Sequence, residues 1–299
     1  MSGIERFSRW VYKTIYRNTH SKQYQHNKNL WPYFKVIRSG SGELSDVFFK
    51  GNRISSIDLN FSIKNKPLVI MATGPSVGDI NSDFFDESFD YLGVNGAFSM
   101  RTVMFDWYVI LDRDFVKKRL ALVKEIVARK DLVLFCGYAS LEVICSSIPF
   151  AEIRCQMKII EIASARKIER FLMPSGQVNP DDTNYHWHND MGFSDKIERF
   201  LFDYGTVTYP ALQIACLLGY KKIYIAGLDM NNFNLPRFYE TSEDKLPTRL
   251  AKDFENISRS FHSAQAYCSS HNIQVINLSP NSAIDAFPKI RWDKVIKEA

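Results

Sequence analysis

The chain has 299 residues, of which 45% are hydrophobic, 24% charged and 14% aromatic, as expected for one large globular domain or two small ones. This composition excludes a disordered chain, a collagen-like repeat and a disulfide scaffold. No apolar run is long enough to span a bilayer, and no apolar stretch near the start precedes a cleavage site, so we expect a cytoplasmic protein. Five irregularly spaced cysteines without a CxxC pair predict reduced thiols in the core.

The net charge of +5 is unevenly distributed. Residues 1–38 carry eight Lys or Arg and one acidic residue, Glu5, a net charge of +7, which leaves −2 for the remainder. Apolar residues recur at helical spacing at Ile4, Phe7, Val11 and Ile15. This pattern predicts a basic amphipathic helix that either lies on an anionic membrane surface or docks on its own domain, and the sequence leaves both alternatives open.

Residues 39–66 are rich in Ser, Gly and Asn. The segment Lys50–Arg53 predicts a turn between two short strands, residues 47–49 and 54–57. We therefore divide the chain into a basic head with a connector ribbon, residues 1–66, and a second domain, residues 67–299.

From Pro67 onward, short apolar strands alternate with segments of helical length. Strands are expected at residues 68–72, 91–94, 107–111, 132–135, 222–226 and 274–278, and helices at 115–130, 208–218 and 251–270. Such alternation predicts an α/β fold with a Rossmann-like, doubly wound, mostly parallel sheet. Because ligands of such sheets bind beyond the carboxyl ends of the strands, the residues that follow each strand are the candidate site.

Polar residues and glycines follow four of these strands. They are Thr73-Gly74-Pro75-Ser76, Asn95, Asp112-Arg113-Asp114 and Gly227-Leu228-Asp229. Polar groups buried without partners are costly, so their convergence on one sheet edge favours a ligand-binding site. Asp112 and Asp114 suit three roles: binding a divalent cation that carries a nucleoside diphosphate, acting as a general base, or capping the next helix.

Two long polar loops accompany these strands. Residues 230–249 are long for a connector, and we expect them to form a lid beside the site. Residues 174–194 include His186 and His188, but no third ligand follows at a fixed spacing, so we interpret this segment as a solvated loop rather than a metal site.

The order of these motifs resembles that of bacterial CMP-sugar glycosyltransferases. The similarity is to the sialyltransferases of glycosyltransferase family 42 and, more closely, to the lipopolysaccharide-core Kdo transferases. It covers residues 67–290 and is strongest over 206–282. The residues that carry it are Gly74-Pro75-Ser76, Val94-Asn95-Gly96, Leu111-Asp112, Thr206 to Tyr224, Gly227-Leu228-Asp229, Arg237-Phe238-Tyr239 and Asn277 to Ser282.

The resemblance implies an inverting transferase that moves an eight- or nine-carbon 2-keto acid sugar from CMP to an acceptor hydroxyl, with no metal or other cofactor. The nucleotide-binding residues it implies are Gly74, Pro75, Ser76, Asn95, Thr206, Gly227 and Asp229. The N–H groups of Gly74 and Ser76, the Asn95 amide and the Thr206 hydroxyl would face the phosphate. The resemblance also implies that Arg237 and Tyr239 of the lid contact the donor or the acceptor. It adds Ser279, Asn281 and Ser282 of the C-terminal loop to the site.

The general base is assigned by position to Asp112, with Asp114 and Asp253 as rivals. The sialyltransferase pattern has an asparagine where Thr73 stands and a catalytic histidine in a stretch, residues 241–259, that contains none. His262 is the nearest histidine, and we interpret it as a surface or core group. The departures favour a Kdo donor over sialic acid.

A lipid A-linked oligosaccharide acceptor would explain the basic head, which we expect at the cytoplasmic face of the inner membrane. Three alternatives remain: a metal-dependent transferase that uses a nucleoside diphosphate sugar through Asp112-Arg113-Asp114, a CMP-sialic acid transferase, and a membrane-surface binding module without catalysis. A nucleic-acid partner is disfavoured, because the body has a net negative charge.

Overall fold

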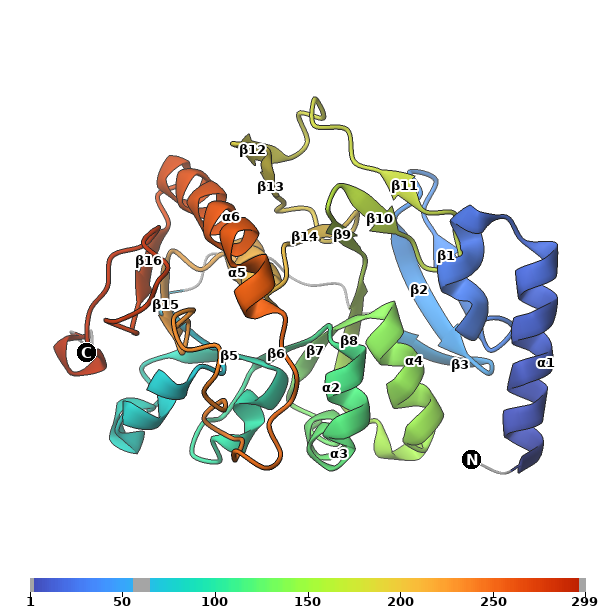
Figure 1. Cartoon of the computed structure of the whole chain (residues 1–299), viewed down its shortest axis with the longest axis horizontal. Helices are drawn as coiled ribbons and strands as arrows, with labels where there is room; N and C mark the ends of the chain where they lie inside the picture. The colour runs from blue at the N-terminus through green and yellow to red at the C-terminus, as the bar shows by residue number, and fades with distance from the viewer. Residues whose placement is uncertain (1–2, 56–64, 296–299) are drawn as a thin grey trace.

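The computed structural model describes residues 3–55 and 65–295. A seven-stranded, fully parallel sheet with the order β16-β15-β4-β5-β6-β7-β8 forms its centre (Figure 1). The strands are β4 (Leu68–Met71), β5 (Asp90–Val94), β6 (Trp107–Ile110), β7 (Val133–Gly137), β8 (Gln156–Ile160), β15 (Lys222–Ala226) and β16 (Gln274–Asn277). The predicted α/β fold and all six predicted strands are confirmed, and β8 is an additional edge strand.

Helices cover both faces of this sheet. They are α2 (Arg113–Lys118), α3 (Leu120–Val127) and α4 (Tyr138–Ser147) on one face, and α5 (Thr208–Leu217) and α6 (Leu250–Ser270) on the other. Side chains alternate along each strand, so Val69 and Met71 pack in the core of the first face while Leu68 and Ile70 pack in that of the second. Short 3₁₀ helices complete the fold: η1 (Lys22–Asn29), η2 (Pro75–Asp79), η3 (Ser82–Phe84), η4 (Asn95–Ser99), η5 (Phe150–Glu152) and η6 (Trp292–Lys294).

The prediction of one helix over residues 115–130 is wrong. Arg119 has φ −118° and ψ 37°, outside helical geometry, and it separates α2 from α3. The predicted helices over 208–218 and 251–270 are confirmed as α5 and α6.

The strand order places a switch point between β4 and β15. The chain runs outward from β4 to β8 in sequence order and then returns to the other side of β4 to form β15 and β16. In open parallel sheets this reversal leaves a crevice beyond the carboxyl ends of the two central strands. The turns at residues 72–76 and 227–230 flank that crevice.

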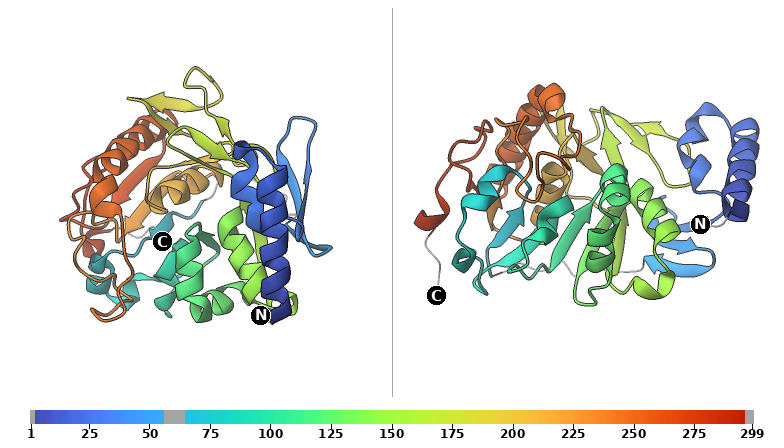
Figure 2. Two further views of the ribbon diagram at one scale, coloured as in Figure 1. Left: turned by 45° about the vertical axis from the view of Figure 1, so that its right-hand side comes forward. Right: turned by 60° about the horizontal axis from the view of Figure 1, so that its bottom comes forward.

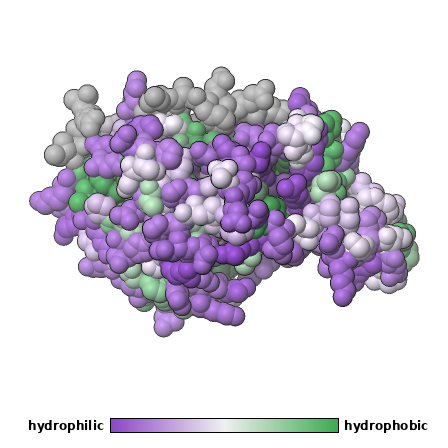
Figure 3. Space-filling model, turned by 90° about the horizontal axis from the view of Figure 1, so that it is seen from above, coloured by the Kyte–Doolittle hydropathy of each residue, from purple (hydrophilic) through white to green (hydrophobic). Residues whose placement is uncertain are grey.

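The N-terminal head consists of α1 (Gly3–Thr19), η1 and a small antiparallel sheet of β1 (Phe34–Arg38), β2 (Leu44–Phe49) and β3 (Asn52–Ser55). The hairpin predicted around Lys50 is confirmed: Lys50 (φ 48°) and Gly51 (φ 86°) supply the two left-handed residues of a tight turn. The predicted continuation through Ile57 lies outside the described residues. Figure 3 shows a lobe that projects on the side where Figure 1 places α1.

The predicted helix in the head is confirmed as α1, and the face that carries Tyr12 and Tyr16 packs against Trp31. Tyr12 packs edge-on against Trp31, with ring centroids 5.6 Å apart, and Tyr16 is buried beside the same ring. Phe7 and Trp10 are 66% and 62% exposed and stack on one another. The chain therefore leaves part of the predicted apolar stripe uncovered.

A buried ion pair joins the head to the body. The guanidinium of Arg38, at the end of β1, donates to both carboxylate oxygens of Glu161 at 2.5 and 3.3 Å, and Glu161 is 3% exposed. Val47 and Phe49 of β2 belong to the same hydrophobic core as Ile159 of β8. The division at residue 66 stays a prediction, but the two parts share one core.

Replacing Arg38 with Met should lower the free energy of unfolding by about 3–5 kcal/mol, because it leaves the Glu161 carboxylate buried without its partner. Urea denaturation of the full chain measures this change. Arg53→Met is the matched control: Arg53 pairs with Asp46 but is 56% exposed, so we expect a loss of about 1 kcal/mol or less. Equal losses in the two variants would contradict the assigned role of the buried pair.

Six short strands cover the carboxyl end of the main sheet. β9 (Ile162–Ser164), β10 (Lys167–Glu169), β11 (Gly176–Gln177) and β14 (Leu201–Asp203) form one small sheet, and β12 (His186–His188) pairs with β13 (Met191–Phe193). The interpretation of residues 174–194 as a solvated loop is wrong in part. Met191 and Phe193 are buried, and the Ser263 hydroxyl of α6 donates to the Met191 carbonyl at 2.9 Å, so this hairpin packs on α6.

All five cysteines are free thiols, as predicted, and four are buried. In the part of the chain that the structure describes, no helix has the length and apolar character needed to cross a bilayer.

Candidate active site

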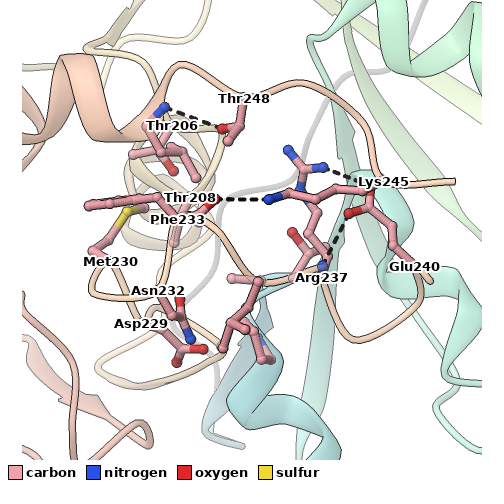
Figure 4. Close-up of a pocket in the computed structure, with 17 residues that line it drawn as sticks. Thr206, Thr208, Asp229, Met230, Asn232, Phe233, Arg237, Glu240, Lys245 and Thr248 are labelled. Atoms are coloured by element: carbon pink, nitrogen blue, oxygen red, sulfur yellow. Dashed lines mark hydrogen bonds and ion pairs between the residues drawn. The ribbon is translucent and has the colours of Figure 1, made fainter. Parts of the chain in front are cut away.

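A cavity of about 80 Å³ lies at the switch point between β4 and β15. Its walls come from the turn after β4, the segment after β14, the turn after β15 and the 230–249 loop (Figure 4). The predicted site residues Gly74, Pro75, Thr206, Gly227, Asp229 and Arg237 all line it. Small-molecule sites typically enclose roughly 300–1,000 Å³, so a nucleotide requires the overlying loop to move.

A buried carboxylate organises the floor of this cavity. Asp229 is 5% exposed, and its carboxylate accepts from the Ser76 N–H at 2.9 Å and from the Ser76 hydroxyl. The Ser76 and Ser279 hydroxyl oxygens are 2.8 Å apart. The fold therefore brings together three predicted residues that lie far apart in the sequence.

The expectation that the N–H groups of Gly74 and Ser76 point to a phosphate is wrong for this structure. Gly74 donates its N–H to the Gly227 carbonyl at 3.0 Å, and Ser76 donates to Asp229. Both donors are used because the turn after β15 presses directly against the turn after β4. A Cβ atom on Gly74 would lie 2.4 Å from the Asp229 Oδ2 atom, so only glycine fits here.

Asn95 offers an unused acceptor at the same edge. Its backbone has φ +46°, its carbonyl accepts from the Tyr108 hydroxyl at 2.7 Å, and its side-chain Oδ1 is buried without a hydrogen-bond partner among the described residues. The Tyr239 ring covers the adjacent Gly96 so closely that a Cβ there would lie 2.1 Å from it. Buried polar atoms without partners are rare in proteins, and a bound ligand at this sheet edge would supply the partner that Asn95 lacks.

The 230–249 loop is held over the cavity by charged contacts. The Arg237 guanidinium pairs with the buried Glu240 carboxylate at 2.7 Å, and the N–H groups of Arg237 and Leu246 donate to the same carboxylate. The Lys245 ammonium donates to the Phe233 carbonyl at 3.2 Å across the loop (Figure 4). Arg119, at the break between α2 and α3, anchors the loop through the Asp244 carbonyl at 2.8 Å.

Tyr239 of this loop is half-buried, and burial raises the pKa of its phenol, with the Arg237 guanidinium acting against the shift and the Glu240 and Asp112 carboxylates adding to it.

The three predicted candidates for a general base occupy different places. Asp112 is exposed and caps α2, accepting from the N–H groups of Asp114 and Phe115 at 2.8 and 3.2 Å. Asp114 points to solvent and pairs with Lys117 at 3.1 Å. Asp253 lies in the first turn of α6, 3.6 Å from the Arg249 guanidinium. Asp112 and Asp114 are thus directed apart, and the described residues contain no group of three or more His, Cys, Asp or Glu side chains able to hold a metal.

The C-terminal loop supports the turn after β15. The Ser282 hydroxyl donates to the Leu228 carbonyl at 2.5 Å, and the Asn281 carbonyl accepts from the Asn231 amide. Ser282 therefore holds the turn after β15, and Ser279 contacts the Ser76 hydroxyl that bonds to Asp229. His262 pairs with Asp285 at 3.1 Å on the surface, in line with its interpretation as a surface group.

Sequence reasoning missed several residues that line the cavity. They are Thr208, Asn232, Phe233, Lys245 and Thr248. Four of them lie in the 230–249 loop, where spacing alone does not select individual residues, and Thr208 begins α5, two residues after Thr206.

Comparison with solved structures defines the fold as one that glycosyltransferases use. The MAf glycosyltransferase from Magnetospirillum magneticum superposes with a TM-score of 0.50 and 14% identity, over 82% of this chain and 37% of that one. The sialyltransferase CstII from Campylobacter jejuni, in complex with cytidine-5'-monophosphate, gives a TM-score of 0.42 and 13% identity over 77% of this chain and 86% of that one.

Sequence comparison is more specific. Residues 187–291 match the family model described as 3-deoxy-D-manno-octulosonic acid transferase WaaZ. Two relatives are named probable 3-deoxy-manno-octulosonic acid transferases: one from Salmonella typhimurium, 38% identical over 102 residues and 30% of this chain, and one from Escherichia coli, 29% identical over 110 residues and 36% of this chain. The matches span only 37% and 38% of those relatives' lengths. They confirm the resemblance to Kdo transferases over residues 187–291, which include the segment where the motifs were strongest.

Proposed function

We propose that this protein is an inverting glycosyltransferase that moves Kdo, or a related 2-keto acid sugar, from a CMP-sugar to a lipopolysaccharide-core or lipid A-linked acceptor, without a metal ion or other cofactor. The observation that carries the proposal is the Kdo transferase match over residues 187–291. That segment contains Asp229, the 230–249 loop, α6 and the C-terminal loop, and so supplies much of the cavity at the switch point.

In this proposal the donor occupies the cavity once the 230–249 loop has opened. Arg237 and Lys245 are the cations that line it, and both can exchange their present partners for the CMP phosphate. The Thr206 hydroxyl can also donate to the phosphate, whereas the unpaired Asn95 amide oxygen, an acceptor, can take a hydrogen bond from a hydroxyl or amino group of the donor. A monophosphate leaving group carries modest charge, so Arg237, Lys245 and Thr206 suffice to stabilise its departure.

The transfer step uses Asp112 as general base. The acceptor hydroxyl oxygen attacks the anomeric carbon while its proton passes to the Asp112 carboxylate. The bond from the anomeric carbon to the phosphate oxygen breaks, and its electron pair leaves with CMP. Attack opposite the leaving group inverts the anomeric configuration.

Calorimetric titration with CMP, CDP and UDP, each with and without magnesium or manganese, tests the proposal. We expect CMP to bind in preference to CDP and UDP, with the same affinity when a chelator is present. Binding of a diphosphate only with metal would overturn the proposal in favour of a metal-dependent transferase that uses Asp112 and Asp114. No nucleotide binding at all would leave a surface-binding module.

The head supplies the contact with the cytoplasmic face of the inner membrane in this proposal. Phe7, Trp10 and Ile15 are exposed on α1, and Arg6 and Arg17 are exposed beside them. Apolar side chains that enter the lipid and cations that stay at the head groups are the combination that holds a helix at an interface.

Replacing Phe7 and Trp10 together with Ser should abolish sedimentation of the protein with phosphatidylglycerol vesicles. The wild-type chain should sediment with them at low salt and less at high salt, because each cation near an anionic surface contributes about 1 kcal/mol that salt screens. Met104→Ser is the control, since Met104 is equally exposed, at 62%, but lies on the body. Equal binding to neutral vesicles, or no loss in the double variant, would contradict a membrane role for α1.

A further inference from the structure

A second, larger cavity opens at the same edge of the main sheet. It encloses about 320 Å³ beyond the ends of β6, β7 and β8, and none of the residues proposed above for the nucleotide lines it. It lies within the size range of small-molecule sites without any movement of the 230–249 loop.

The small sheet builds one wall of this second cavity. Ser164 of β9 is paired with Asp203 of β14 on one side and with Lys167 of β10 on the other. Residues paired across strands point to the same face, so these three polar side chains form a row. Ile162 and Glu169 lie two residues away on the same face, and all five line the cavity. The opposite face, with Ala163, Ile168 and Phe202, is buried in the core.

The polar groups of this wall are already held in place. The Glu169 carboxylate accepts from the Lys167 ammonium at 2.8 Å and from the Tyr138 hydroxyl at 2.6 Å, which ties β10 to the first turn of α4. The Asp203 carboxylate accepts from the Gly205 N–H at 2.9 Å, and burial raises the pKa of this carboxyl group. Apolar side chains from Leu111, Ile160 and Ile162 complete the lining.

Alternating apolar surface and fixed hydrogen-bonding groups match the chemistry of a sugar ring, which presents C–H faces and a rim of hydroxyl groups. The proposed function already assigns the first cavity to the nucleotide. We infer that the second cavity, walled by Ser164, Lys167, Glu169 and Asp203, is the binding site for the acceptor saccharide. The inference rests on the proposed function, because it takes the first cavity as the donor site.

Two placements link this cavity to the rest of the molecule. Leu111 lines it, and the next residue is Asp112. The proposed base is therefore the neighbour in sequence of a residue that lines the second cavity. Asp203 is three residues before Thr206, which lines the first cavity, so one short segment also joins the two sites.

The head lies on the side of the second cavity. Arg9 of α1 pairs with Glu142 of α4 at 2.8 Å, and the same helix supplies Tyr138 and Ala139 to the cavity wall. Figure 2 shows α1 standing alongside the body next to α4. A lipid-linked saccharide held at a membrane beside α1 would thus reach the second cavity before the first.

The test fills the cavity without disturbing the core. Ser164 is exposed on a strand, a position that accepts a large aromatic residue, so Ser164→Trp should fold normally. A deacylated lipopolysaccharide-core oligosaccharide is the probe, titrated by calorimetry in the presence of CMP. We expect Ser164→Trp to lower its affinity about tenfold or more, and Asp203→Asn to lower it by a smaller factor, with CMP affinity changed by less than about twofold in both. Ala121→Trp, at an exposed position on α3, is the matched control.

Each other outcome has a distinct meaning. Unchanged oligosaccharide affinity in Ser164→Trp, or no oligosaccharide binding to a wild-type chain that binds CMP, would overturn the acceptor site and leave the proposed function standing. A wild-type chain that does not bind CMP would overturn the proposed function. In that case, oligosaccharide binding that Ser164→Trp abolishes would still support a saccharide site, and its absence would overturn both.

Discussion

Replacing Asp112 with Asn should lower the rate of sugar transfer by about 10²- to 10⁴-fold, the usual contribution of a general base, while leaving the fold intact. This variant separates the role of Asp112 as the cap of α2 from its proposed role as the general base. Asn caps a helix about as well as Asp, so the hydrogen bonds to the Asp114 and Phe115 N–H groups are retained. The amide, however, cannot accept the proton of the acceptor hydroxyl. Release of CMP from the CMP-sugar in the presence of acceptor measures the rate.

Two further variants complete that experiment. Asp112→Ala removes the cap as well and should also lower the free energy of unfolding by about 1 kcal/mol. Asp114→Asn is the control for charge, because Asp114 is exposed and paired with Lys117, and it should retain activity. A fully active Asp112→Asn variant would exclude Asp112 as the base and direct the same test to Asp253.

The sequence predicts the main sheet well because most of its strands are buried on both faces and read as continuous apolar runs. β8 was not predicted because it is an edge strand whose Gln156 and Lys158 interrupt the apolar pattern. The sequence also does not predict the break between α2 and α3 at Arg119, because the flanking residues favour helix on both sides.

The location of the site follows from the sequence, but its internal bonding does not. Polar residues after β4 and β15 indicate the sheet edge, and the structure brings Gly74, Ser76 and Asp229 together there. The hydrogen bond from the Ser76 N–H to Asp229 depends on the distance between two turns that are 153 residues apart in the sequence. Local sequence carries no information on that distance.

The second cavity could not be predicted from the sequence. It depends on the register of β9, β10 and β14, each only three residues long. Periodicity over three residues does not distinguish a strand from a loop. Ser164, Lys167 and Asp203 therefore carried no signal until the pairing of these strands placed them in one row.

The glycine after β4 is the position where the smallest substitution should have a large effect. The backbone of Gly74, at φ −64°, is one that alanine adopts readily, so any defect in Gly74→Ala comes from the added methyl group alone. That methyl would lie 2.4 Å from the Asp229 carboxylate and 2.5 Å from the Gly227 carbonyl oxygen. Neither atom can easily move aside, because the Asp229 carboxylate is buried and hydrogen-bonded to Ser76, and the Gly227 oxygen belongs to the backbone.

The two turns at the switch point must therefore separate in Gly74→Ala, which breaks the hydrogen bond from the Gly74 N–H to Gly227 and displaces Asp229 from Ser76. We expect a loss of about 1–3 kcal/mol in the free energy of unfolding, typical of overpacking, and CMP binding too weak to detect by calorimetry. Gly78→Ala is the matched control in η2, the 3₁₀ helix that Gly74 precedes, because a Cβ there meets nothing within 4 Å. It should keep CMP affinity and leave stability unchanged or raised by about 0.4–1 kcal/mol. A Gly74→Ala chain that binds CMP like the wild type would show that the nucleotide does not rely on this turn, and the donor site would then have to lie elsewhere along the sheet edge.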